Sequence, residues 1–319
     1  METRIPAPAV LSLAWEGAAL VDWVAGKRYG ARGDVESIPR FGAPFDHAIS
    51  SPSGDYVVVY ARLGTKALLL YKGELLREIN RSYYLAGVYE YPIALVRLNS
   101  GREAMIHCPD QYNRLEIDDL ETGERLTLDQ HRKPSDFFHS RLACALDGTM
   151  LLSAGWLWHP LDEVRAYNIE SALGNPSRLD ADGQTGSTWA DESSATFLRD
   201  GRLAVAVAGF EDEDSSVDDS PELRLFDLSG STPASKVKLA ARAGTMMAVG
   251  VRHLLTLHEF PRLVNIETGL AEQTWPHIAS GLQTSSILDR NNLPPPIALD
   301  HAGQRCAIAD ATGITVLQF

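Results

Sequence analysis

Cysteine is scarce in this chain and is not arranged for metal binding. The three cysteines, Cys108, Cys144 and Cys306, are widely spaced, and no Cys-x-x-Cys pair occurs. An odd number at wide spacing argues against a disulfide framework and against a zinc site. We therefore expect reduced, buried thiols, with no metal and no cofactor.

Basic residues and long apolar runs are lacking as well. Lys and Arg number 29 against 42 Asp and Glu, which gives a net charge of −13. Without a basic cluster, neither nucleic acid nor a membrane is expected as a partner. The longest apolar runs, such as LAVAVAGF (203–210), are much shorter than a membrane span requires. The N-terminal stretch does not resemble a signal peptide, so we expect a cytoplasmic protein.

Common catalytic motifs are also missing. The sequence has no nucleophile elbow, P-loop, HExxH motif or dinucleotide fingerprint. We therefore expect no catalytic residues and no enzymatic activity. A metal site is an alternative only if the separate residues His139, His159, Asp191 and His258 converge.

The chain does contain an internal repeat. In each copy an alternating apolar segment runs into a polar turn closed by glycine, and a more apolar segment follows. The turn glycines, 37 to 53 residues apart, are Gly17, Gly54, Gly101, Gly148, Gly201, Gly250 and Gly303. Glycine suits such turns because it tolerates a positive φ.

Each copy continues with a third strand, and most have a short fourth segment. ELRLFDLSG (222–230) is an example of a third strand, and RLTLD (125–129) and SRLD (177–180) are fourth segments. Four strands at a period of 40 to 50 residues are typical of a propeller blade. The sequence therefore predicts an all-β, seven-bladed β-propeller of four-stranded antiparallel blades, forming a single domain over residues 1–319.

The blade boundaries follow from the repeat. We place the blades at about 8–40, 43–80, 90–130, 139–180, 193–240, 244–276 and 295–319. The last unit ends after its third strand, so residues 2–7 are expected to pair with it and close the ring. A six-bladed ring is the alternative, because the segment KRYGARG (27–33) is poor in β-forming residues.

The third strands also carry a family resemblance. They end in Ile117-Asp118, Tyr167-Asn168 and Phe226-Asp227, where WD40-like β-propellers place a Trp-Asp pair. The chain resembles that family over nearly its whole length at the level of pattern, although it lacks the Trp-Asp and Gly-His pairs themselves. The resemblance implies a rigid platform that binds partners.

One group of loops is the candidate binding site. We call top the face with the loops between second and third strands and the connections between blades, because its loops are long and irregular. The segment SAGWLWHPLDEV (153–164) and its neighbours on this face supply the candidate contacts Trp156, Trp158, His159, Asp162, Phe138, His139, Trp189 and Asp191. Rigid aromatic side chains are typical of interface hot spots. The alternative is that these aromatic residues only cap the blade core.

Two further loops belong to the expected top face. The segment 211–222 is highly acidic and includes Glu211, Asp212, Glu213, Asp214, Asp218 and Asp219. It does not match a calcium loop, since Val217 and Leu223 stand where glycine and glutamate are needed. We expect a solvated loop, or one that attracts a basic partner. The connection 276–296 is expected to be a surface loop, or to fold over the top or the edge of the ring.

These features predict a protein-interaction scaffold that binds a protein partner through its top face. The alternative function is a small-molecule-binding propeller, or one of hydrolase or lyase type, with its site at the top mouth of the central channel.

Overall fold

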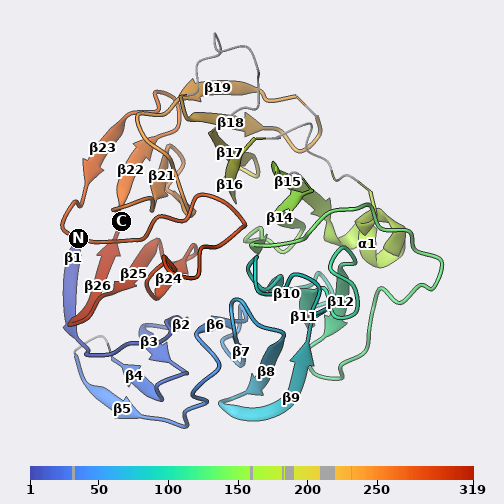
Figure 1. Cartoon of the computed structure of the whole chain (residues 1–319), viewed down its shortest axis with the longest axis horizontal. Coiled ribbons are helices and arrows are strands. Elements are labelled where there is room, and N and C mark those ends of the chain that lie inside the picture. Colours follow the sequence, from blue (N-terminus) through green and yellow to red (C-terminus); the bar gives the residue numbers. More distant parts are fainter. Residues whose placement is uncertain (31–32, 159–160, 182, 184–189, 209–219, 231) are drawn as a thin grey trace.

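The chain folds into a closed ring of seven β-sheets, arranged as the blades of a propeller (Figure 1). The structure, a computed structural model, describes residues 1–319 except 31–32, 159–160, 182, 184–189, 209–219 and 231. Within those residues no helix is both long and apolar enough to cross a membrane. The predicted seven-bladed all-β propeller is confirmed, and the six-bladed alternative is wrong.

Blades 1 and 2 are antiparallel four-stranded sheets whose first strand lines the centre of the ring. Blade 1 comprises β2 (Ala14–Glu16), β3 (Ala19–Asp22), β4 (Lys27–Tyr29) and β5 (Val35–Ser37). Blade 2 comprises β6 (His47–Ser50), β7 (Tyr56–Tyr60), β8 (Lys66–Tyr71) and β9 (Glu74–Asn80). The segment that favoured a six-bladed ring thus contains the short third strand of blade 1.

Blades 5 and 6 follow the same order. Blade 5 comprises β16 (Glu192–Phe197), β17 (Leu203–Ala208), β18 (Glu222–Phe226) and β19 (Ser235–Lys238). Blade 6 comprises β20 (Met246–Val249), β21 (His253–Thr256), β22 (Arg262–Asn265) and β23 (Ala271–Thr274). Their inner strands are almost wholly buried and their outermost strands largely exposed, which is why hydrophobicity falls from the first two strands to the fourth.

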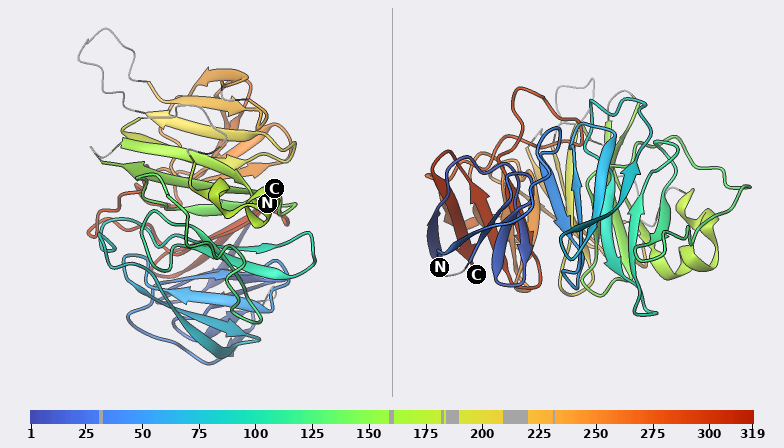
Figure 2. Two further views of the ribbon diagram at one scale, coloured as in Figure 1. Left: turned by 90° about the vertical axis from the view of Figure 1, so that its right-hand side faces the viewer. Right: turned by 90° about the horizontal axis from the view of Figure 1, so that it is seen from below.

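Blade 7 closes the ring as predicted. It comprises β24 (Ile297–Asp300), β25 (Arg305–Ala309), β26 (Gly313–Gln318) and, as its outer strand, β1 (Glu2–Pro6). β1 pairs antiparallel with β26 from Glu2 opposite Leu317 to Pro6 opposite Gly313. The two termini consequently lie side by side (Figure 2).

The outermost position is irregular in blades 3 and 4. Blade 3 comprises β10 (Ile93–Arg97), β11 (Glu103–His107) and β12 (Glu116–Asp119), and Arg125 bridges Asp118 where a fourth strand would begin. Blade 4 comprises β13 (Leu142–Cys144), β14 (Met150–Leu157) and β15 (Leu161–Asn168). There the chain turns into α1 (Ile169–Gly174), which Asn168 caps, and a 3-10 helix (Pro176–Leu179). The segment SRLD, expected to be a strand, therefore lies mainly in this 3-10 helix.

The core is divided among the blade interfaces. Seven apolar clusters each join two neighbouring blades around the ring. One turn between a first and a second strand, in blade 4, fits such an interface closely. At Gly148, φ is +72° and an added Cβ would lie 2.3 Å from the carbonyl oxygen of Arg97 in blade 3. An eighth cluster, which is aromatic, lies outside this pattern.

Candidate functional site

The eighth cluster is the base of an aromatic patch on the top face, which we define as Tyr84, Tyr89, Tyr112, Phe138, Trp156 and Trp158. Its centre is a stack in which the rings of Phe138 and Trp156 lie 4.0 Å apart and those of Tyr112 and Phe138 lie 4.2 Å apart. Trp158 stands edge-on to Trp156 at 5.6 Å. Such offset and edge-to-face contacts are favourable arrangements of aromatic rings.

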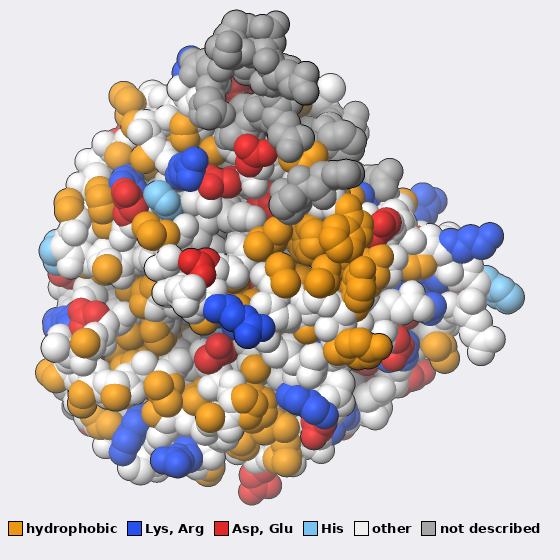
Figure 3. Space-filling model, in the orientation of Figure 1, with side chains coloured by type: hydrophobic (Ala, Val, Ile, Leu, Met, Phe, Trp, Pro, Cys, Tyr) orange, Lys and Arg blue, Asp and Glu red, His pale blue; other side chains and the backbone are white. Residues whose placement is uncertain are grey.

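The patch has a buried base and an exposed rim. Phe138 and Tyr89 are fully buried and Trp156 is 3% exposed, whereas Trp158 is 47% and Tyr84 43% exposed. Figure 3 shows hydrophobic side chains gathered on this face over the region of β14. The prediction that Phe138 and Trp156 contact a partner directly is therefore corrected, because their burial leaves them to support the exposed rings.

The hairpin of β14 and β15 and the chain leading into β13 position the stack. Trp156 lies near the end of β14, and its backbone N–H donates to the carbonyl of Phe138 at 3.1 Å, while Phe138 N–H donates to Trp156 at 2.9 Å. This bridge adds a short extra pairing beyond β13. Because side chains alternate along extended backbone, Trp156 and Trp158 both project toward Phe138.

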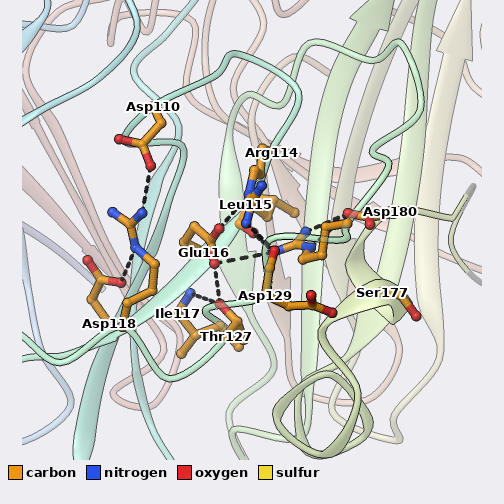
Figure 4. A network of polar contacts seen from close by, with 12 residues as sticks. Asp110, Arg114, Leu115, Glu116, Ile117, Asp118, Thr127, Asp129, Ser177 and Asp180 are labelled. Carbon is orange, nitrogen blue, oxygen red and sulfur yellow. Dashed lines mark hydrogen bonds and ion pairs between the residues drawn. The ribbon is translucent and has the colours of Figure 1, made fainter.

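A network of buried charges anchors the loop before Phe138 (Figure 4). The guanidinium of Arg132 donates two hydrogen bonds to Asp180, at 2.7 and 2.9 Å, and lies 3.2 Å from Glu116. Asp180 also accepts from the backbone N–H of Lys133 at 2.8 Å. Glu116 is bound in turn by Arg114 at 2.6 Å. Together these contacts fix the loop where a regular fourth strand of blade 3 would have run.

The end of the same loop is tied to the patch itself. Tyr112 donates its phenolic O–H to Asp136 at 2.7 Å. Burial and this carboxylate raise the pKa of Tyr112 to about 12, so the ring stays protonated and neutral at ordinary pH. The fixed position of Tyr112 allows it to cover one side of Phe138.

Asp162 joins three parts of the ring and is not at the surface. It is buried and accepts hydrogen bonds from the Ser286 hydroxyl at 2.7 Å, the Ser285 hydroxyl at 3.1 Å and the Ser193 backbone N–H at 3.0 Å. Arg141 lies 3.6 Å away. Burial raises the pKa of Asp162, and these donors and Arg141 oppose the shift. The predicted partner contact at Asp162 is thus corrected to a structural role.

Ser285 and Ser286 belong to a strap, residues 276–296, that connects blade 6 to blade 7 and reaches across the centre of the ring (Figure 1). Ile287 packs against the aromatic cluster, and Leu288 N–H donates to the carbonyl of Val88 at 2.9 Å. Of the two expectations for this connection, the fold over the top is the one found.

The described members of the possible metal site, His139, Asp191 and His258, do not form a group of metal ligands. His139 is buried, its Nδ1 is 3.1 Å from Ser153 Oγ, and burial and the Arg165 charge lower its pKa well below the ordinary value. A partner contact at His139 is therefore corrected as well, whereas Asp191 is exposed. Among the residues that the structure describes, no group of three or more His, Cys, Asp or Glu could hold a metal ion.

Several predicted contacts lie outside the described residues. They are His159, Trp189, Glu211, Asp212, Glu213, Asp214, Asp218 and Asp219. The structure in turn adds Tyr84, Tyr89 and Tyr112, which sequence reasoning missed. The signal for the first two was RSYYLAGVYEY (81–91), a connection between blades with four tyrosines.

The alternative site, the central channel, is also present as a cavity. It has a volume of about 920 Å³ and is lined by the first strands of several blades. Arg62, Glu90, Arg141 and Gln283 line it near its top mouth, where the first strands begin. Its volume lies within the range of small-molecule sites.

Comparison with known proteins identifies the fold. No protein-family profile matches this chain, and no curated protein matches its sequence. The chain is similar to a solved structure of Kuenenia stuttgartiensis hydrazine synthase, with a TM-score of 0.61 and 14% identity, covering 100% of this chain and 97% of that one. It is also similar to a chain of the mitotic checkpoint complex, with a TM-score of 0.62 and 10% identity, covering 100% and 94%. At such identities the likeness shows the propeller fold alone.

Proposed function

We propose that this protein is a non-catalytic interaction scaffold that holds a protein partner on its aromatic patch. The observation that carries the proposal is the exposure of Trp158 and Tyr84 above the buried stack of Phe138 and Trp156. Exposed apolar groups gathered in one place usually mark an interaction site. Aromatic residues are also enriched among the side chains that dominate binding energy.

The exposed rings are held in place before any partner arrives. Trp158 rests edge-on against Phe138 at 5.5 Å, and Tyr84 lies against Tyr112 at 5.1 Å. The base beneath them is fixed by the backbone pairing of Phe138 with Trp156 and by the buried charges around Arg132. Binding would therefore order few side chains, which lowers its entropic cost.

Charge and pattern support the same proposal. A net charge of −13 favours a partner with a basic surface, and the acidic segment 211–222 would add to that attraction. The WD40-like pattern of the third strands supports a platform role, and one structural neighbour is a chain of a multiprotein complex.

The proposal can be tested by placing a photoreactive phenylalanine analogue at position 158 in the full chain. We expect one protein to be cross-linked there and none at position 71, an exposed tyrosine at the opposite end of blade 2. The variant with Trp158→Ala and Tyr84→Ala should then bind the identified protein at least about thirtyfold more weakly. The matched control, Tyr71→Ala with Leu75→Ala, removes similar exposed apolar area and should bind normally. Equal affinity of both double variants would exclude the patch.

A further inference from the structure

The top mouth of the central channel holds an arginine and a glutamate that are not paired with each other. Arg62 follows β7, and Glu90 lies in the connection that leads to β10. Gln283 of the strap reaches the same mouth, where its amide nitrogen lies 3.4 Å from the Glu90 carboxylate. Three elements that are distant in the sequence thus converge on one end of a cavity.

Arg62 is held firmly but its charge is unmatched. Its backbone N–H donates to Asp46 at 2.7 Å and its carbonyl accepts from Tyr91 N–H at 2.9 Å. The residue is only 5% exposed, and its Nε is buried without a hydrogen-bond partner. Within the described part of the chain, its guanidinium forms no ion pair with a carboxylate. A buried charge of this kind is costly unless an acceptor is supplied.

The hydrogen bond that the guanidinium of Arg62 forms with His47 does not neutralise its charge. Nη2 of Arg62 lies 3.0 Å from Nδ1 of His47. Burial and the Arg62 charge lower the pKa of His47 well below its ordinary value, so the imidazole is neutral and accepts the hydrogen bond. At the edge of the cavity the guanidinium of Arg62 therefore has a neutral hydrogen-bond partner and no carboxylate within the described residues.

Among the described residues Glu90 forms no close ion pair, although the charges of Arg81 and Arg141 act on it from a longer distance. Arg81 donates to backbone carbonyls, including those of Ala86 and Tyr89. Arg141 donates to the carbonyls of Ala154 and Ser193 and lies beside Asp162. In the described part of the chain the mouth thus presents a guanidinium and a carboxylate, neither of which forms a close ion pair.

The channel wall also carries apolar side chains among its polar ones. Those that line it include Ile49, Ile93, Ala143, Ala154, Ala195 and Met246. Charged groups at the mouth and apolar side chains along the wall suit a small ligand with a polar head and an apolar tail.

We propose that the top mouth of the central channel binds a small zwitterion of the amino-acid class, with its carboxylate on Arg62 and its ammonium on Glu90. A guanidinium binds carboxylates through strong charge-assisted hydrogen bonds, and the Glu90 carboxylate accepts them from an ammonium. The side chain of the ligand would lie against the apolar side chains of the wall. This site is separate from the aromatic patch and does not depend on a protein partner there.

Calorimetric titration of the whole protein with the standard L-amino acids tests the proposal. For a ligand such as L-leucine we expect binding that is lost with 4-methylpentanoate, which lacks the ammonium, and with 3-methylbutylamine, which lacks the carboxylate. These two comparisons need no variant. If no amino acid binds at millimolar concentration, or if the acid alone binds as tightly as the amino acid, the zwitterion site is overturned.

Variants then assign the two contacts. Arg62→Gln and Glu90→Gln should each weaken binding by at least about tenfold, since a hydrogen bond to a charged group is lost. Arg97→Gln is the matched control, because Arg97 is exposed at the other end of the channel wall. This variant should bind the amino acid with an affinity within about twofold of wild type. Unchanged binding in a folded Arg62→Gln or Glu90→Gln protein would overturn the assignment.

Discussion

Replacing Asp180 with alanine should loosen the loop that carries Phe138 while leaving every aromatic side chain in the sequence. The substitution removes the carboxylate that accepts two hydrogen bonds from the buried guanidinium of Arg132 and one from the backbone N–H of Lys133. Among the described residues Arg132 would keep the Leu115 carbonyl at 2.7 Å and the Glu116 carboxylate at 3.2 Å. Its charge would then be buried without its two hydrogen bonds to Asp180.

The expected cost follows from that burial. Removing one partner of a buried ion pair lowers the free energy of unfolding by about 3–5 kcal/mol, because the remaining charge is buried without compensation. For a chain of 319 residues, an unfolding entropy of about 2.1 cal/mol/K per residue converts this cost into a Tm lower by about 4–8 °C. Glu267→Ala is the matched control, since Glu267 pairs with Arg252 at 2.9 Å but both side chains are exposed. Its cost should be at most about 1 kcal/mol.

Circular dichroism measures both consequences. Thermal unfolding in the far ultraviolet gives the Tm, and the near-ultraviolet signal reports the stacking of Phe138, Trp156 and Trp158. We expect Asp180→Ala to lower the Tm and to weaken the near-ultraviolet signal below the transition, and Glu267→Ala to do neither to a comparable extent. A Tm decrease no larger than that of Glu267→Ala would refute the argument that the network anchors the loop.

Two further predictions concern stability. The pKa of His139 is lower in the folded protein than in the unfolded chain, so acid favours the unfolded chain, which takes up the proton. The free energy of unfolding is therefore unaffected by His139 above about pH 6.5 and decreases below it, by at most about 1.4 kcal/mol per pH unit. His139→Gln should therefore flatten the fall in urea midpoint between about pH 6.5 and 5, and an unchanged slope would contradict this. Gly148→Ala should destabilise by about 1–3 kcal/mol more than Gly101→Ala in urea unfolding, since both have positive φ but only Gly148 faces a close backbone oxygen. An equal loss of stability in the two variants would show that the backbone around Arg97 moves away from the added methyl group at little cost.

The architecture could be predicted from the sequence because each blade repeats the same local pattern. Turn glycines such as Gly101 and Gly201 have positive φ, as the hairpins require, so their spacing marks each blade directly. The segment SRLD could not be assigned this way, since four residues with one buried leucine fit a strand or a short helix equally well. The side chains of Asn168 and Asn175 accept hydrogen bonds at the N-termini of α1 and the 3-10 helix and so stabilise the helical conformation there.

The candidate site was predictable only in part. The aromatic segment around Trp156 and Trp158 is evident in the sequence, but alternation alone cannot tell which ring is covered. Phe138 covers Trp156 through a backbone pairing that no local pattern indicates. The contact of Asp162 with Ser286 joins residues 124 apart, and one sequence contains no signal for such a pair.

That long-range contact also bears on how the ring unfolds. Repeat proteins whose units touch only their neighbours can lose stability unit by unit from a weak point. Here the strap joins blades 6 and 7 to the far side of the ring, through Asp162 in blade 4 and Val88 before blade 3. Opening any one blade interface therefore leaves the two halves tethered, so the ring should unfold as a single cooperative unit. Closure of the ring should also be a late step of folding, because the contacts of the strap join residues far apart in the sequence and form only after blades 3 to 6 are in place.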